Sequence, residues 1–281
     1  MSAAARRWVL PGGTMLMAPA LVYLCLVYLA PLAFLLARSF VVDGALSLAP
    51  YTDLLSDPFT WQVIGNTLRV AALTTLLALA IGYPTAIALS RARGWLQIAL
   101  LVSIVLPLSV GIVVKAFAWQ IVLSRNGIVG QILVGSGLFE NAPQLLFTQT
   151  GLIIGAANVF LPFMILPIYS VLNLMDDRLP EAAATLGASP VYRFTRVTLP
   201  LTLPGIVAGC AFVFSMSVSM YVIPSLLIGD RFQTLATLTG RSFLFMRNEQ
   251  LGSTTAVLLL TISVAIILAA SALARRVGGV R

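Results

Sequence analysis

Residues 151–174 read GLIIGAANVFLPFMILPIYSVLNL, a run without a charged side chain. A helix that crosses a bilayer needs about 20 mostly apolar residues, because lipid offers no hydrogen-bonding partner and every backbone N–H and C=O group has to be paired inside the helix. The run is long enough and apolar enough to meet this requirement. It therefore predicts a transmembrane helix, and the class of the whole protein depends on how often such runs recur.

Five further runs of the same kind flank this one. We expect them to form transmembrane helices over residues 14–37, 65–90, 96–123, 202–228 and 254–274. The predicted fold class is an all-α integral membrane protein with six transmembrane helices. The first run is longer than a signal-peptide core and lacks a convincing cleavage site after it, so we interpret it as an uncleaved anchor. We expect residues 14–274 to form one domain between two cytoplasmic ends, residues 1–13 and 275–281.

The composition supports a chain that is solvated mostly by lipid. Of the 281 residues, 59% are hydrophobic and 9% are charged, whereas about 25% are charged in soluble domains. These values exclude a soluble enzyme, a disordered chain and a nucleic-acid binder, although the isoelectric point is near 10.2. The chain has no His, the commonest metal ligand and general base, and we expect no metal site and no catalytic residues. Cys25 and Cys210 lie in apolar runs, where we expect small buried side chains rather than a disulfide.

The distribution of arginine predicts the orientation of the chain. With the N-terminus in the cytoplasm, the inner segments carry ten basic and three acidic residues, and the outer segments carry five basic and six acidic residues. Because cytoplasmic loops of membrane proteins are enriched in Arg and Lys, this bias places both termini in the cytoplasm.

Few polar side chains fall inside the predicted helices, and we treat them as candidate residues of a substrate path. No Asp or Glu lies in the six runs, which argues against a proton relay. Lys115 lies about 12 Å from the outer end of its run, and it can either face a water-filled path or extend its stem to the membrane surface. The other candidates can line the path, or they can serve only in helix packing or as aromatic residues at the membrane interface. They are Trp119, Asn158, Ser215, Ser219 and Tyr221. Pro107 and Pro224 are candidate gating breaks, or they only shape the packing.

The inner segment 176–200 predicts two short helices joined by a glycine turn. Pro180 and Glu181 suit the first turn of a helix, and the alanines that follow are strong helix formers. Gly187 is expected to end this helix in a left-handed conformation. Ser189 is expected to cap a second helix that starts at Pro190 and ends at Pro200.

This segment carries a recognisable pattern. Glu181-Ala182-Ala183-x-x-x-Gly187, nine further residues and then Val197-x-Leu199-Pro200 resemble the EAA loop of ABC importer permeases, with Val197 where Ile is usual. Other motifs resemble the spermidine/putrescine-type permeases within that group: Asn66-Thr67-Leu68, Gly82-Tyr83-Pro84, Lys115-Ala116-Phe117-Ala118-Trp119, Leu161-Pro162-Phe163-Met164, Pro167-Ile168-Tyr169 and Pro204-Gly205-Ile206-Val207-Ala208-Gly209. The resemblance covers the chain from about residue 15.

The resemblance implies a type I ABC importer permease in the bacterial inner membrane. Such a subunit forms half of the path for a small organic solute, here a polyamine or a related compound, which a periplasmic binding protein delivers. The other half would come from a second permease subunit, expected to be a distinct paralogue. Two cytoplasmic ATPase subunits would bind ATP and Mg²⁺ and contact the coupling loop, while this chain binds no cofactor. The coupling residues implied are Glu181, Ala182, Ala183, Gly187, Arg193 and Pro200.

Several alternatives remain open from the sequence. The chain is not expected to be an enzyme, because an ATP-binding P-loop needs Gly-Lys-Ser/Thr and the only lysine is Lys115. A secondary carrier often shows internal repeats or buried ion sites, and we find no convincing repeat between the halves of the sequence. An intramembrane enzyme would need His or acidic residues near the membrane, where the only acidic pair is Asp176-Asp177. A permease of the same family for an anionic or zwitterionic solute, such as an opine, an amino-acid derivative or a phosphonate, fits the charge of Lys115 better than a polyamine does.

Overall fold

The computed structural model describes residues 19–42, 44–137, 139–176 and 178–278 of the chain. Within these residues it contains six helices that are long and apolar enough to cross a membrane, which confirms the predicted fold class. Their bounds are Pro19–Phe40, Pro58–Arg91, Ile112–Gly135, Gln149–Leu174, Pro190–Val218 and Glu249–Ala272. Residues 1–18 and 279–281, including the predicted N-terminal segment 1–13 and the start of the first predicted helix, lie outside the described residues.

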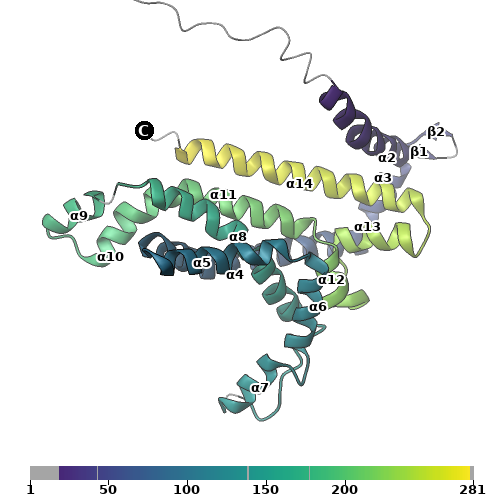
Figure 1. Cartoon of the computed structure of the whole chain (residues 1–281). Helices are drawn as coiled ribbons and strands as arrows, with labels where there is room; N and C mark the ends of the chain where they lie inside the picture. Colours follow the sequence, from purple (N-terminus) through teal and green to yellow (C-terminus); the bar gives the residue numbers. More distant parts are fainter. Residues whose placement is uncertain (1–18, 43, 138, 177, 279–281) are drawn as a thin grey trace, which may run out of the picture.

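Four long helices run side by side and form the body of the protein (Figure 1). They are α4 (Pro58–Arg91), α8 (Gln149–Leu174), α11 (Leu199–Val218) and α14 (Glu249–Gly278). Helix α8 packs against both α4 and α11 and supplies the centre of the core with Phe160, Met164, Ile165 and Ile168, which are at most 2% exposed. The pattern fits the sequence, because a helix that is apolar on all sides is stable only where protein or lipid surrounds it.

The contact between α8 and α11 depends on a small residue at the crossing. A Cβ atom on Gly209 would lie 2.9 Å from the Met164 Sδ atom and 3.0 Å from the Met164 carbonyl oxygen. Only glycine therefore fits at this position without a shift of the backbone. Small residues commonly allow this close approach in membrane proteins, where tight van der Waals packing holds helices together.

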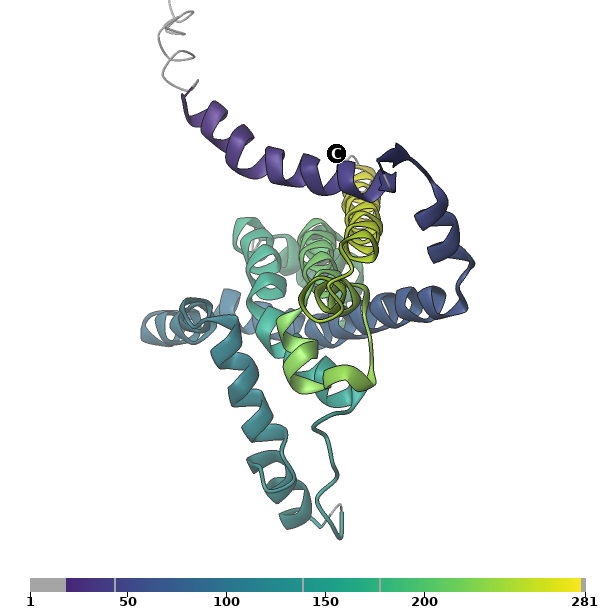
Figure 2. The same ribbon diagram turned by 90° about the vertical axis from the view of Figure 1, so that its right-hand side faces the viewer.

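The predicted single helix over 96–123 is wrong, because the chain breaks in its middle. Helix α5 (Trp95–Val105) continues into the 3₁₀ turn η2 (Leu106–Ser109), and α6 (Ile112–Leu123) then starts anew. Val110 and Gly111 between them have extended ψ values of 127° and 146°. Pro107 lies in η2, where its missing N–H removes a helical hydrogen bond. The chain after the break, α6 and α7 (Ile128–Gly135), diverges from the bundle (Figure 2).

The predicted helix over 202–228 is also wrong at both ends. Its inner end joins the preceding segment, so that one helix runs from Pro190 to Val218. At its outer end the helix stops at Val218, and the short α12 (Val222–Leu227) follows separately. In an unbroken helix Pro224 would leave the Met220 carbonyl group without its hydrogen bond, which accounts for a break at this place.

The outer segments contain structure that the sequence analysis treated as connectors. They hold a hairpin of β1 (Val41–Val42) and β2 (Ala45–Leu46), helix α3 (Ala49–Ser56) and helix α13 (Leu235–Leu244), which packs against α14. Helix α4 also starts earlier than predicted, because the Asp57 carboxylate caps it by accepting the Phe59 N–H over 2.9 Å.

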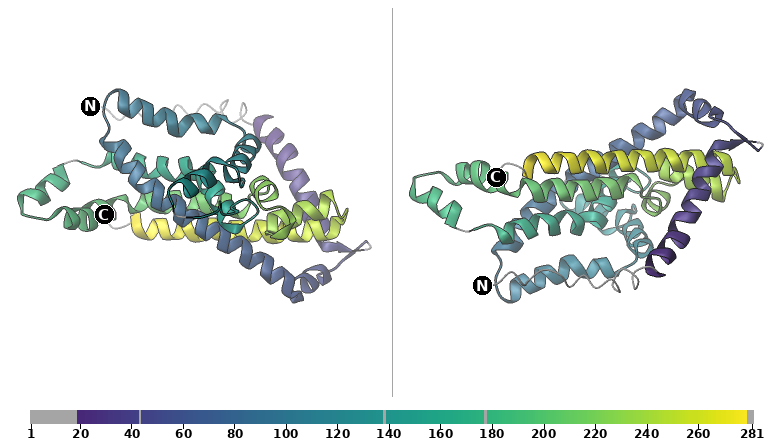
Figure 3. Two further views of the ribbon diagram at one scale, coloured as in Figure 1. Left: turned by 90° about the horizontal axis from the view of Figure 1, so that it is seen from below. Right: turned by 90° about the horizontal axis from the view of Figure 1, so that it is seen from above.

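The first membrane helix projects away from the bundle over its N-terminal part, whereas its C-terminal end packs against α14 (Figures 2 and 3). It contains a π-helical turn η1 (Cys25–Leu29) followed by α2 (Ala30–Phe40). None of the residues in its most apolar stretch is buried by the rest of the chain. Cys25 is accordingly exposed, which corrects the expectation that it is buried, whereas Cys210 is half-buried, and both thiols are free. An apolar helix with this exposure faces lipid or another subunit.

Candidate functional site

The predicted coupling segment projects from one end of the bundle (Figure 3). It consists of α9 (Arg178–Thr185), α10 (Pro190–Arg193) and the π-helical turn η3 (Phe194–Thr198). Helix α9 begins two residues before Pro180, because the Arg178 N–H donates to Asp176 Oδ1 over 2.9 Å. Glu181 lies in the first turn and is exposed, a position where a carboxylate is stabilised by the positive end of the helix dipole.

The turn between α9 and α10 has the predicted conformation. Gly187 has a φ of 82°, in the left-handed region that glycine adopts without steric cost. The Gly187 N–H donates to the Ala184 carbonyl and the Ala188 N–H donates to the Ala183 carbonyl, each over 3.0 Å, which is the pattern of a Schellman cap. The next helix begins as predicted at Pro190, with the Ser189 Oγ accepting the Tyr192 N–H. The short loop is thus fixed by its own backbone.

Pro200 does not end the second helix, which corrects the prediction. Helix α10, η3 and α11 form one continuous helix from Pro190 to Val218. In η3 the Leu199 N–H donates to the Phe194 carbonyl, five residues back. This wider turn stands directly before Pro200, where an ordinary α-helix would place the proline ring against a carbonyl group. The coupling segment is therefore continuous with a core helix.

The coupling segment exposes an unusual amount of apolar surface for a loop outside the bundle. The exposed fractions are 48% for Leu179, 87% for Leu186, 72% for Val191 and 56% for Tyr192. Glu181 lies within the same short segment and also borders a cleft of about 300 Å³ that Arg91 and Thr198 line. We refer to Leu179, Glu181, Leu186, Val191 and Tyr192 as the coupling surface. Exposed apolar side chains gathered on one short segment are typical of a site of protein interaction.

Two of the six predicted path residues meet in the structure. The Trp119 Nε1–H in α6 donates to Asn158 Oδ1 in α8 over 3.2 Å. The neighbouring Gln120 donates from Nε2 to the Leu226 carbonyl in α12. Lys115 lies one turn before Trp119, is half-buried, and is in neither of the ion pairs found among the described residues.

The remaining predicted path residues lie elsewhere. Ser215 borders an apolar groove between α11 and α14 that Phe212 and Ile267 also line. Ser219 donates its hydroxyl hydrogen to the Ser215 carbonyl over 3.1 Å, at the end of α11. Tyr221 precedes α12 and lines a different cavity, described next. The structure thus does not gather the six residues into one site.

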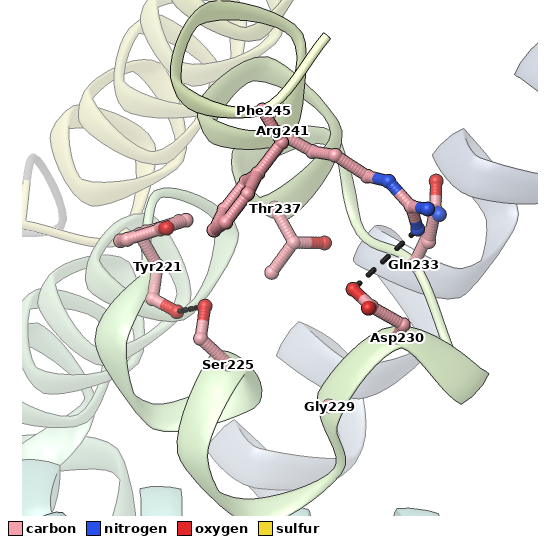
Figure 4. A pocket seen from close by; sticks show the side chains of 8 residues that line it. All are labelled: Tyr221, Ser225, Gly229, Asp230, Gln233, Thr237, Arg241 and Phe245. Atoms are coloured by element: carbon pink, nitrogen blue, oxygen red, sulfur yellow. Dashed lines mark hydrogen bonds and ion pairs between the residues drawn. The ribbon is translucent and has the colours of Figure 1, made fainter.

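Sequence reasoning missed a polar cavity of about 240 Å³ at the end of the bundle opposite the coupling surface. Tyr221 and Phe245 form one side, Asp230 and Gln233 form the other, and an ion pair of 3.4 Å joins Asp230 to Arg241 (Figure 4). The turn at Gly229 and a capping box between Thr234 and Thr237 shape the cavity wall. The sequence Thr234-Leu-Ala-Thr237 lacks the Glu or Gln that usually marks a capping box, so this cap was not readable in advance.

The sequence and the fold match known transport proteins. Residues 141–279 match the family described as "Binding-protein-dependent transport system inner membrane component". The spermidine/putrescine transport system permease protein PotB of Haemophilus influenzae is 35% identical over 232 residues, which cover 80% of this chain and 81% of the relative. The Escherichia coli PotB is 32% identical over 218 residues, 78% of this chain and 79% of the relative.

The fold comparison gives the same architecture. The crystal structure of a bacterial ABC transporter involved in the import of the acidic polysaccharide alginate contains a chain that superposes with a TM-score of 0.77 and covers 94% of both chains. The two sequences are only 17% identical, so this similarity concerns the fold alone.

Proposed function

Because this chain belongs to the family of binding-protein-dependent transport system inner membrane components, we propose that it carries polyamines of the spermidine/putrescine class. The chain is a multi-pass inner-membrane protein and a transmembrane subunit of an ABC importer. The substrate class is supported by relatives of 32% and 35% identity whose names specify spermidine and putrescine. Both relatives match about four fifths of this chain, so the similarity extends over most of the membrane domain.

The observation that carries the importer function is the coupling surface. Five exposed residues, four of them apolar, stand outside the bundle on a loop that a Schellman cap holds in shape. An exposed apolar patch beside a carboxylate suits a protein partner better than water or lipid headgroups. We assign this partner as a cytoplasmic ATPase subunit, which would bind ATP and Mg²⁺. This assignment places the coupling surface and both termini in the cytoplasm, in agreement with the arginine bias.

The opposite end of the bundle would then face the periplasm and receive the solute-binding protein. We assign a second, distinct permease chain to the remaining half of the path, and the exposed first helix and the exposed Asn158 offer surface for such a subunit. The alternative of an anionic or zwitterionic solute rested on Lys115. It is not favoured, because relatives of 35% and 32% identity carry polyamine names.

The function is tested on the complete complex in proteoliposomes, with the ATPase subunits, the second permease and the cognate binding protein. Uptake of radiolabelled putrescine is expected to require ATP inside and binding protein outside. Glu181→Ala is expected to lower both uptake and ATPase co-purification at least tenfold. Glu140→Ala, which removes an exposed carboxylate in the outer segments, serves as the matched control. Retention of full uptake and co-purification in Glu181→Ala would contradict the assigned role of the coupling surface.

A further inference from the structure

The polar cavity opposite the coupling surface has the features of a site for a cationic group. It lies between α12 and α13 (Figure 4). Its lining has two aromatic rings, the hydroxyl groups of Tyr221, Ser225 and Thr237, the Gln233 amide group, the Asp230 carboxylate and the Arg241 guanidinium group that pairs with it. Its volume of about 240 Å³ is enough for the end of a flexible chain. No other part of the proposed function uses this cavity.

The Asp230 carboxylate is available to a ligand. Its side chain is 87% exposed, and the ion pair with Arg241 measures 3.4 Å. Strong charge-assisted hydrogen bonds are shorter, about 2.7–2.9 Å, and exposed pairs contribute little to stability because water screens them. A competing cation can therefore replace Arg241 at a small cost in free energy.

A second acceptor lies in the same wall. The Oε1 atom of Gln233 is buried and has no hydrogen-bonding partner among the described residues. Buried polar atoms in native proteins are normally paired, so this oxygen lacks a donor. Gln233 and Asp230 also line an adjoining cavity of about 370 Å³, where Gln62, Asn66 and Gln149 add amide groups. An extended chain with several N–H donors finds acceptors in both cavities.

The wall that carries these groups is fixed to the body of the bundle. Asn66 in α4 donates from Nδ2 to the Gln233 carbonyl over 3.2 Å, and the Leu235 N–H donates to Thr67 Oγ1 over 2.8 Å. On the other side, the Tyr221 ring packs against α13 at Gly240, where an added Cβ atom would lie 3.0 Å from the Tyr221 Cζ atom. Sites held by rigid elements in this way preserve their geometry when a ligand is absent.

We infer that this cavity receives a primary ammonium group of the solute as it leaves the binding protein. Asp230 supplies the opposite charge, Gln233 Oε1 accepts a hydrogen bond, and the rings of Tyr221 and Phe245 shield the cation and attract it through their faces. Arg241 turns toward solvent when the ammonium group arrives. The inference rests on the proposed polyamine function and adds the place where the permease first holds the solute.

The test measures putrescine and spermidine uptake by the complete complex at a saturating concentration of binding protein and at several solute loads. Asp230→Asn is expected to lower initial uptake about fivefold, in line with the loss of one partly screened charge pair. Arg241→Gln removes the competitor and is expected to raise uptake at low load. The matched control is Glu140→Gln, which removes an exposed carboxylate elsewhere in the outer segments.

The uptake rates of these variants distinguish a failure of the cavity inference from a failure of the proposed polyamine function. Equal uptake in Asp230→Asn and Glu140→Gln would overturn the cavity inference while leaving the polyamine function intact. A loss in Arg241→Gln as large as that in Asp230→Asn would also overturn it, because the pair would then act only in holding the fold. If the wild-type complex moves neither polyamine, the proposed substrate and the inference both fail. Assembly with the ATPase subunits, measured by co-purification, is expected to be unchanged in all three variants.

Discussion

The indole N–H group of Trp119 in α6 donates a hydrogen bond to the Asn158 side-chain oxygen in α8 over 3.2 Å. Trp119 follows the break at Val110–Gly111 by less than three helical turns, and Asn158 is exposed on the otherwise well-buried α8. The bond therefore connects the helix that diverges from the bundle to the helix at its centre.

Removing the indole donor is expected to weaken this connection. Trp119→Phe keeps an aromatic ring but loses the N–H group, and the free energy of unfolding is expected to fall by about 1 kcal/mol. Thermal unfolding of the purified complex measures the change as a lower midpoint. The control is Trp95→Phe, because Trp95 is 79% exposed. Equal midpoints for the two variants would show that the bond contributes nothing.

The cap at Gly187 predicts a contrast between two substitutions. No atom lies within 4 Å of the position that a Cβ would take at Gly187, so only the positive φ restricts the residue. Gly187→Val is expected to lose transport, because a β-branched residue is strained there by about 1–2 kcal/mol, while membrane insertion remains normal. Gly187→Asn is expected to retain most activity, because asparagine tolerates this conformation. Full transport by Gly187→Val would contradict the role of the cap.

Lys115 tests the charge of the path. If the side chain faces the path, Lys115→Met is expected to raise uptake of putrescine, because it removes a repulsion of about 1 kcal/mol at close range in a wet cavity. Uptake by the complete complex and binding-protein-stimulated ATP hydrolysis measure the effect. Arg69→Met removes an exposed positive charge from α4 and is the control. Unchanged kinetics in Lys115→Met would leave the extended, surface-directed lysine as the correct interpretation.

The orientation can be tested with single cysteines in a variant that lacks Cys25 and Cys210. Cysteines introduced at Ser2 and Val280 are expected to react with an impermeant maleimide only after the cells are permeabilised. A cysteine at Glu140 is expected to react in intact cells. Labelling of Ser2→Cys or Val280→Cys from outside would refute the orientation derived from the arginine bias.

The features that were predictable from the sequence depend on local chemistry. The six apolar runs, the left-handed glycine at Gly187 and the Ser189–Pro190 helix start each require only a few neighbouring residues. The resemblance of the coupling segment to a known loop was carried by the same short stretch. These features could be predicted because none of them depends on a contact with a residue that is distant in the sequence.

The features that were missed depend on backbone conformation inside apolar sequence or on distant pairing. Val110 and Gly111 lie within the continuous apolar run 96–123, so hydropathy predicts a helix there, although the backbone is extended at both residues. Pro200 predicted the end of a helix, but the wider π-helical turn η3 before it lets the helix continue. The pairing of Asp230 with Arg241 needs the turn at Gly229 and the position of α13. The sequence shows that both charged residues are present, but it does not show that folding brings them together.

The continuous helix from Pro190 to Val218 has a mechanical consequence. Its 29 residues make a rod of about 43 Å, with part of the coupling surface at one end and the break before α12 at the other. A tilt of about 10° around its midpoint displaces each end by about 4 Å in opposite directions. The rod can therefore act as a lever, in which a small push on α10 moves the wall next to Tyr221 without any change inside the helix itself.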